Sequence, residues 1–184
     1  MTGGKRARVS LFMLALAALL SAPYAHAATK AELNRDSSRM LKSLYKQNNL
    51  ANVLKSKARA VLVFPSIVKA GFMFGGAIGE GVLYRNGKPV GYYNSVAASY
   101  GLQAGVQKYG YAIFFMNEDA IAYLDKTEGL EIGVGPSIVL VDEGMGKSTT
   151  SNTLTQDAYA FVFDQKGLMA GLGLQGSKIT KIEK

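Results

Sequence analysis

The chain has 184 residues, of which 21 are Lys or Arg and 13 are Asp or Glu, and it contains no Cys, no Trp and a single His. This length fits one domain, because a domain typically takes roughly 100–200 residues. With 48% hydrophobic and 18% charged residues, the composition excludes a disordered or fibrous chain. The formal charge of +8 indicates an anionic partner, either nucleic acid or a membrane, and the position of the charges distinguishes the two.

Residues 1–27 have the pattern of a secretory signal peptide. Three basic residues precede the apolar run 9–20, and the small-residue pattern Ala25-His26-Ala27 follows it. We therefore expect cleavage after Ala27 and export across the inner membrane, with a periplasmic or extracellular location, free or peripheral on a membrane. The alternative is an uncleaved membrane anchor, which would need about 20 apolar residues.

Cleavage would remove His26, so that the exported chain would contain neither His nor Cys. Nucleophilic systems that depend on Cys–His or Ser–His–Asp are then excluded, and the usual zinc, copper and haem ligands are missing. The carboxylate pairs Glu118-Asp119 and Asp142-Glu143 are poor acid–base candidates, because adjacent side chains point in different directions. We expect no enzymatic activity, no metal and no cofactor.

The positive charge is concentrated in residues 28–70, which hold nine basic and two acidic residues, a net charge of +7. Thr29 and Glu32 form a capping-box pattern that predicts the start of a helix. Apolar residues continue at helical spacing to Tyr45, and a second short helix is expected over residues 50–54. The basic side of this region is either an ordinary solvated helix face or an interfacial helix on an anionic membrane, and the two interpretations are compatible.

Short apolar stretches alternate with turn signals from Ala60 onward. Pro65 is expected to stop a first strand, Asn86-Gly87 predicts a two-residue hairpin turn, and Asn117 is expected to cap a helix over residues 118–126. The strands that we expect are 61–64, 72–84, 90–96, 97–107, 111–116, 132–134, 137–141, 158–164 and 168–174. Because many glycines lie within these strands, we expect sharp bends in the sheet.

The predicted fold class is α+β, with N-terminal helices packed on a curved, glycine-rich antiparallel β-sheet or a partly closed barrel. The expected organisation is a signal peptide over residues 1–27, a basic helical region over residues 28–54 and a β-rich domain over residues 55–184. No linker divides this β-rich part.

Two glycine motifs fail as nucleotide sites. Gly171–Gly176 has the spacing G-x-G-x-x-G, but only eight residues follow it, too few for a βαβ unit. Gly146-Lys147-Ser148 resembles the end of a P-loop, but Val141 occupies the position of its first glycine. Export also removes the usual nucleic-acid partners, so we expect no nucleic-acid binding.

A series of short motifs runs in order from Lys55 to the C-terminal end. It comprises K-x-K-A-x-A-V-L-V-F-P at 55–65, V-K-A-G-F at 68–72, G-E-G-V-L at 79–83, G-Y-Y-N at 91–94, G-L-Q-A-G at 101–105, and K-G-L-M-A-G-x-x-x-Q-G-S-K-I at 166–179. The series resembles the SYLF-domain family of lipid-binding proteins. In eukaryotic relatives, which bind phosphoinositides and in some cases actin, membrane binding is attributed to an amphipathic N-terminal helix and nearby basic residues.

The resemblance implies a secreted bacterial lipid-binding protein and carries the basic positions over to Lys55, Lys57, Arg59 and Lys69. We add Arg39, Lys42 and Lys46 from the predicted basic helix. Because export disfavours actin and phosphoinositides, anionic phospholipid head groups are the expected target.

The alternative is a structural or protein-interaction domain of the cell envelope with no lipid specificity and with a protein partner there. A hydrolase that uses Ser, Lys or carboxylates is the weakest hypothesis, because no nucleophile–base pair can be assembled from the sequence. The sequence leaves the particular lipid and the oligomeric state open.

Overall fold

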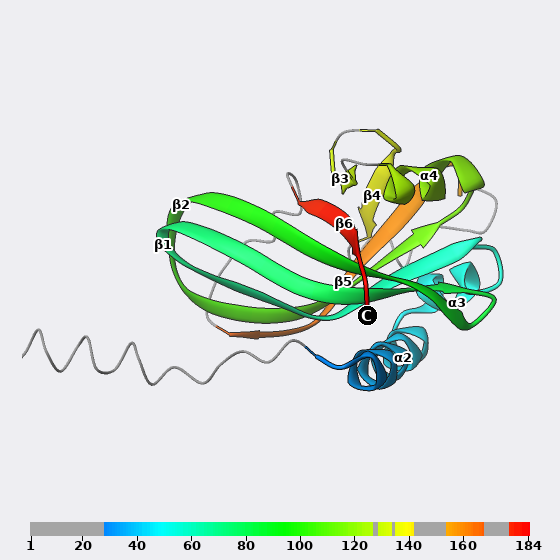
Figure 1. Cartoon of the computed structure of the whole chain (residues 1–184), viewed down its shortest axis with the longest axis horizontal. Helices are drawn as coiled ribbons and strands as arrows, with labels where there is room; N and C mark the ends of the chain where they lie inside the picture. Colours follow the sequence, from blue (N-terminus) through cyan, green and yellow to red (C-terminus); the bar gives the residue numbers. More distant parts are fainter. Residues whose placement is uncertain (1–27, 127–128, 134, 142–153, 168–176) are drawn as a thin grey trace, which may run out of the picture.

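A computed structural model describes residues 28–126, 129–133, 135–141, 154–167 and 177–184 (Figure 1). Two N-terminal helices are followed by a long β-hairpin and then by shorter helices and strands. The predicted signal peptide, the carboxylate pair Asp142-Glu143, the residues around Lys147, the predicted strand 168–174 and the Gly171–Gly176 motif lie outside the described residues.

The two N-terminal helices begin at side-chain caps. α2 (Lys30–Gln47) starts at Thr29, whose hydroxyl accepts a hydrogen bond from the Glu32 backbone N–H, while the Glu32 carboxylate accepts one from the Thr29 backbone N–H at 3.0 Å. The predicted capping box is therefore confirmed. Asn48 is extended, which ends α2, and its side chain accepts from the Ala51 N–H at 2.9 Å and so caps α3 (Asn49–Leu54).

One hairpin supplies most of the sheet. β1 (Ala60–Arg85) and β2 (Lys88–Phe115) pair antiparallel along their length. They meet at the predicted turn, where Asn86 and Gly87 take positive φ values of 51° and 74°, as a two-residue hairpin of this sequence requires.

The prediction that Pro65 stops the first strand is wrong. β1 continues through Pro65, and the pairing register shifts between Phe64 and Ile67. Such an irregularity accommodates proline, which has no N–H to donate to the ladder. The strands predicted separately between residues 61 and 84, and those between residues 90 and 116, are thus parts of two continuous strands.

The remaining strands extend the sheet from the edge of β2 that does not pair with β1. β5 (Ala158–Gly167) pairs with residues 107–115 of β2, and β6 (Lys178–Ile182) pairs with residues 92–96. β3 (Leu130–Glu131) pairs antiparallel with β6, and β4 (Ile138–Val141) pairs parallel with β5. Between β2 and β3 lie α4 (Glu118–Ala122), capped by Asn117 as predicted, and the 3-10 turn η1 (Tyr123–Asp125).

The sequence reasoning misplaced one short strand and missed another. The predicted strand at 132–134 lies at Leu130–Glu131 instead, and β6 was not expected. Among the described residues, six strands form one sheet in the order β3-β6-β2-β5-β4, with β1 on β2. The predicted curved and mostly antiparallel sheet is confirmed.

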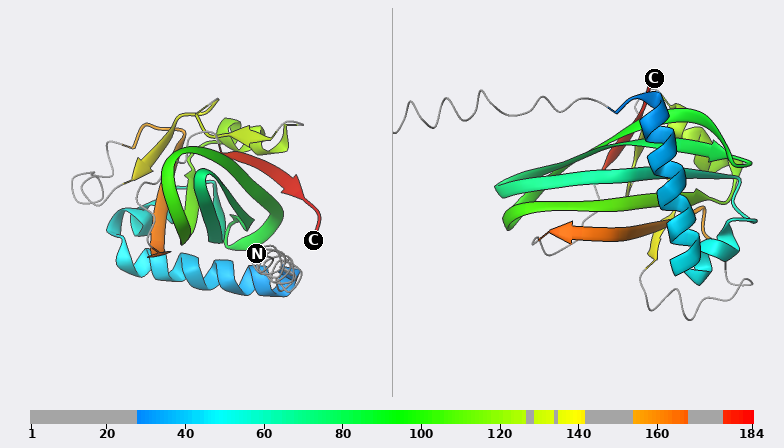
Figure 2. Two further views of the ribbon diagram at one scale, coloured as in Figure 1. Left: turned by 90° about the vertical axis from the view of Figure 1, so that its left-hand side faces the viewer. Right: turned by 90° about the horizontal axis from the view of Figure 1, so that it is seen from below.

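The curl of the sheet comes from the hairpin, which bends over itself as an arch (Figure 2). Two glycines allow the halves of β1 to approach closely. A Cβ atom added at Gly79 would lie 2.5 Å from the Ser66 carbonyl oxygen, and one added at Gly81 would lie 2.6 Å from the Phe64 ring. The buried side chains of this interior include Leu62, Phe64, Tyr93, Tyr111 and Ile113.

A second hydrophobic cluster lies between the sheet and the N-terminal helices, where α2 crosses the strands (Figure 2). The helices contribute four buried leucines, Leu33, Leu44, Leu50 and Leu54, and the strands contribute residues that include Val61, Val63, Phe114 and Phe161. Because α2 buries this apolar side, its basic side faces solvent.

Candidate functional site

The exposed side of α2 carries a row of four cations, Arg35, Arg39, Lys42 and Lys46. Spacings of four, three and four residues place side chains on one helix face. Together with Ser38 and Ser43, these residues line a shallow groove of about 560 Å³. We call this row the basic ridge.

One carboxylate lies beside the ridge. Asp36 accepts contacts of 3.1 Å from both Arg35 and Arg39, whose side chains are 67% and 69% exposed. Exposed pairs of this kind contribute little to stability, about 0–1 kcal/mol, because water and salt screen them. An incoming anion can therefore compete for both guanidinium groups.

A deeper groove lies between α2, the segment 55–61 and the hairpin turn Asn86-Gly87. It has a volume of about 490 Å³, and its cations are Lys42, Lys55 and Arg59. The Lys55 ammonium lies 5.3 Å from the centre of the Tyr45 ring, a cation–π distance. Burial raises the pKa of Tyr45 to about 12. Like any tyrosine phenol at neutral pH, its hydroxyl is protonated and can donate a hydrogen bond. We call this the basic groove.

The structure brings six of the seven predicted lipid-binding residues to the exposed surface of the N-terminal region. They are Arg39, Lys42, Lys46, Lys55, Lys57 and Arg59. Lys69 does not belong to this surface. Its neighbours Val68 and Ala70 are exposed, so strand alternation turns Lys69 inward, where it is only 5% exposed.

Sequence reasoning missed several residues of the two grooves. Arg35 could have been found from its spacing, because it stands four residues before Arg39 on the same helix face. Tyr45 was expected only as part of the apolar side of the helix. Its place in the basic groove depends on the packing of α2 against the segment 55–61. Local sequence patterns do not predict this tertiary contact.

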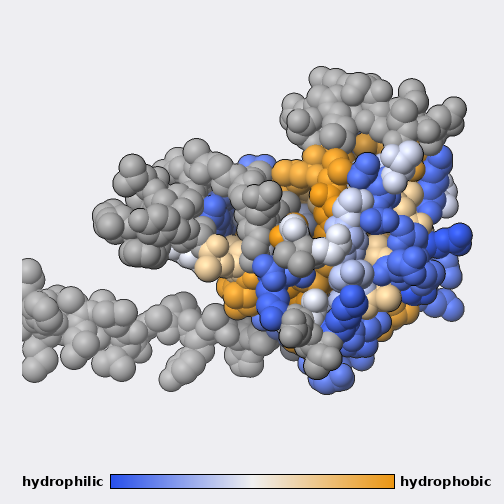
Figure 3. Space-filling model, turned by 90° about the horizontal axis from the view of Figure 1, so that it is seen from above, coloured by the Kyte–Doolittle hydropathy of each residue, from blue (hydrophilic) through white to orange (hydrophobic). Residues whose placement is uncertain are grey.

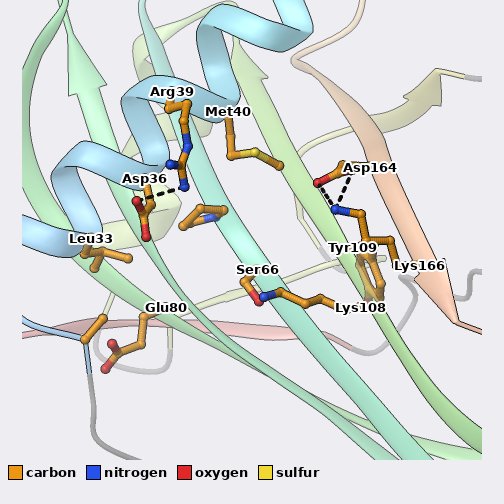
Figure 4. Close-up of a pocket in the computed structure, with 12 residues that line it drawn as sticks. Leu33, Asp36, Arg39, Met40, Ser66, Glu80, Lys108, Tyr109, Asp164 and Lys166 are labelled. Atoms are coloured by element: carbon orange, nitrogen blue, oxygen red, sulfur yellow. Dashed lines mark hydrogen bonds and ion pairs between the residues drawn. The ribbon is translucent and has the colours of Figure 1, made fainter.

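A third groove lies on the other side of α2, against β1, β2 and β5, and has a volume of about 380 Å³ (Figure 4). Its charged residues are Asp36, Arg39, Glu80, Lys108, Asp164 and Lys166. We call it the polar groove. Opposite charges pair within it, Asp36 with Arg39 at 3.1 Å and Lys166 with Asp164 at 3.3 Å, so it has no excess positive charge.

Lys184 connects this region to the start of the described chain. Its ammonium donates to the Glu80 carboxylate at 2.9 Å and to the Ala28 carbonyl oxygen at 2.7 Å. With the Lys184 side chain only 11% exposed, the contact ties the C-terminal end to the residue that precedes the capping box. It also neutralises the Glu80 carboxylate.

Within the described part of the chain, no group of three or more His, Cys, Asp or Glu side chains could hold a metal ion. The Glu118 carboxylate of the pair Glu118-Asp119 binds Arg85 at 2.7 Å, and both residues lie in the first turn of α4, where acidic side chains are favoured. None of the described helices is long and apolar enough to cross a membrane.

The face away from α2 has a different character. Hydrophilic residues gather at the end that carries α4, and hydrophobic residues lie toward the middle of this face (Figure 3). This face therefore mixes hydrophilic and hydrophobic residues, whereas the basic ridge lies on the side of α2.

A curled, mostly antiparallel sheet with an exposed cationic helix defines a β-rich scaffold that presents a charged surface. Residues 96–184 match the family model described as Ysc84, Las17-binding protein actin regulator. This match agrees with the resemblance to the SYLF-domain family that the sequence motifs predicted. The matched residues include most of β2 and all of α4 and β3–β6, whereas the basic ridge lies before them. No curated protein shows a significant match to the chain.

Proposed function

We propose that this protein is a non-enzymatic, exported module that recognises anionic phospholipid head groups through the basic ridge and the basic groove. The observation that carries the proposal is the concentration of exposed cations on one helical region. Residues 28–70 have a net charge of +7, whereas residues 71–184 have a net charge of −2. The positive electrostatic potential of the molecule is therefore concentrated on one side, and an anion is attracted to that side.

The physical basis is additive electrostatic attraction. Each Lys or Arg near an anionic membrane surface contributes about 1 kcal/mol, and the effect falls off within a Debye length. The ridge places four such residues in a row on a helix face. Ser38 and the protonated Tyr45 phenol lie beside the cations and can donate hydrogen bonds to phosphate oxygens.

The experiment is flotation with vesicles of phosphatidylcholine alone and of phosphatidylcholine mixed with phosphatidylglycerol. The test variant is Lys42→Glu/Lys46→Glu on the ridge. The matched control is Lys126→Glu/Lys181→Glu, which makes the same change in net charge at exposed positions near η1 and on β6. We expect the ridge variant to lose at least about tenfold in partition to the mixed vesicles, and the control to change little.

Equal binding of the wild-type protein to both kinds of vesicle would overturn the proposal. Equal losses in the two double variants would also overturn it, because net charge rather than the ridge would then explain binding.

The second candidate is a protein-interaction domain of the cell envelope. It is favoured by the description of the matched family, which names a protein-binding role. Recovery of a tight protein partner by cross-linking, combined with no vesicle binding, would decide for this candidate.

A further inference from the structure

Large aliphatic side chains are exposed on both halves of the bent hairpin, close to the bend. Val68 is 41% exposed, Ile78 57%, Val96 47% and Val106 60%. Ile78 and Val96 are direct cross-strand partners, as are Ala70 and Val106, and partners of this kind point to the same face of a sheet. We call these residues the apolar patch.

Apart from Val68, which stands next to Lys69, the patch lies within two stretches of strand that carry no charge. Residues 70–79 of β1 contain no Asp, Glu, Lys or Arg, and neither do residues 89–107 of β2. Exposed strands of soluble proteins normally carry charged side chains, which discourage association. The bend therefore lacks the charged side chains that normally discourage association of an exposed strand with another apolar surface.

Lysines stand at the rim of the patch. Lys108 is the cross-strand partner of Val68, and Lys178 is the partner of Val96. Lys166 in turn pairs with Lys108 across β2 and β5. All three side chains are exposed. A lysine beside apolar surface can lay its aliphatic stem along that surface and keep its ammonium in the polar zone.

The polar groove places the patch next to α2. Both Glu80 and Lys108 line this groove together with residues of α2. Ile78 lies two residues beyond Glu80, and Val106 lies two residues beyond Lys108, in each case toward the bend. Residues two apart in a strand share a face and are about 7 Å apart. Along both strands, the polar groove therefore lies between α2 and the apolar patch, and the patch is the part nearer the bend.

We infer that the bend of the β1–β2 hairpin inserts its apolar patch into the interfacial zone of a lipid bilayer, so that the membrane is held at two places. This inference rests on the proposed function and adds to it a hydrophobic contact. The patch enters below the head groups, and the rim lysines and the basic ridge remain at their level. The bilayer is the occupant because an uncharged aliphatic surface bordered by lysines matches the apolar interior and the anionic surface of such a membrane.

The absence of Cys from the sequence allows a direct test with single-cysteine variants labelled with the fluorophore NBD. Labels are placed in turn at Ile78→Cys and Val106→Cys in the patch. The matched control is Val90→Cys, also on β2 and 53% exposed, but near the hairpin turn and flanked by Lys88. Each protein is mixed with vesicles of phosphatidylcholine and phosphatidylglycerol, with and without lipids that carry a quencher in the acyl chain.

We expect a blue shift and strong acyl-chain quenching at positions 78 and 106, and neither effect at position 90. If the protein floats with the vesicles but positions 78 and 106 are not quenched, insertion is overturned and the proposed function stands. If the protein does not float with these vesicles, both fail. A third outcome is that the label at position 106 is shielded from water without vesicles, and more so as the protein concentration rises. This would show that a second copy of the protein covers the patch, and it would also overturn the inference.

A charge placed in the patch provides the second test. Val106→Asp should lower vesicle partition by about tenfold or more, because a carboxylate is costly below the head groups. Val90→Asp should change partition much less. Equal effects of the two substitutions, with circular dichroism spectra that show both variants folded, would contradict insertion at the bend.

Discussion

At the scale of single residues, two glycines determine how tightly the hairpin folds over itself. Gly79 faces the Ser66 backbone, and Gly81 faces the Phe64 ring. Neither position has a left-handed φ, so the requirement for glycine there is one of space. The close approach of the halves of β1 creates the interior in which Lys69 is buried.

Gly79→Ala should therefore destabilise the protein by about 1–3 kcal/mol, the usual cost of forcing extra atoms into a packed site. Gly76→Ala is the matched control. A Cβ atom at Gly76 would meet only the Ala97 carbonyl oxygen at 3.6 Å, an ordinary contact, so its effect should stay within about 0.5–1 kcal/mol in either direction. Urea unfolding of the two variants measures the difference, and equal stabilities would show that β1 is not packed this closely.

The sequence could predict bending but not which glycines are required. Glycines within strands indicate bends and close approaches in general. The partner of Gly79, Ser66, lies 13 positions earlier in the sequence, and the pair is defined only once the strand has folded back. The orientation of Lys69 was missed for a similar reason. Its positive charge suggested a binding role, but the face of β1 to which it points was not considered.

At the scale of elements, Asp157 joins α4 to β4 and β5. Its carboxylate accepts hydrogen bonds from the backbone N–H and the hydroxyl of Ser137, both at 3.0 Å, and from the Asn117 side chain at 2.8 Å. Asn117 in turn caps α4 by accepting from the Ala120 N–H. These bonds, of which that from the Ser137 backbone is the largest cause, lower the pKa of Asp157 in the folded protein.

The direction of this shift predicts a dependence of stability on pH. Because the folded state favours the carboxylate, Asp157 contributes stability above its unfolded pKa of about 3.9 and loses that contribution as pH falls through its lower folded pKa. Asp157→Ala should lower the melting temperature at pH 6 and should reduce the loss of stability between pH 6 and pH 3.

Asp119→Ala, at an exposed position in the first turn of α4, is the control of equal charge. Melting temperatures at the two pH values should separate the two variants. The account of Asp157 would be contradicted if Asp157→Ala showed the same acid sensitivity as the wild-type protein.

Elements with a local signal were predicted correctly. Thr29 and Asn117 cap the helices that they were expected to cap, and Asn86-Gly87 forms the hairpin turn, because each of these features depends on a few neighbouring residues. Pro65 misled the prediction because its effect depends on whether the strand can shift register. β6 was missed because pairing with β2, rather than a pattern of its own, makes it a strand.

At the scale of the whole molecule, the sequence located the charged region but not its shape. Counting charges identified residues 28–70, and helical spacing indicated that several cations share a face. The basic groove could not be predicted, since Lys42, Arg59 and Gly87 meet there only through tertiary packing. The apolar patch likewise depends on strand pairing, which sets Ile78 beside Val96 and Ala70 beside Val106.

In the function that we propose, electrostatic attraction to an anionic bilayer is the main source of binding, and the apolar patch adds a second contact. Screening weakens such attraction as the Debye length shortens from about 10 Å at 0.1 M salt to about 3 Å at 1 M. Hydrophobic contact is not weakened by salt in this way, so the two sources of binding respond differently to it.

The most direct measurement is therefore the partition of the wild-type protein to vesicles that contain phosphatidylglycerol, followed over this range of salt concentration. We predict a steep fall in partition with increasing salt, a shallower fall for Lys42→Glu/Lys46→Glu from a lower starting value, and little binding to phosphatidylcholine alone at any salt concentration. Partition that does not change with salt, or that is equal for the anionic and neutral vesicles, would contradict recognition of anionic head groups by the basic ridge.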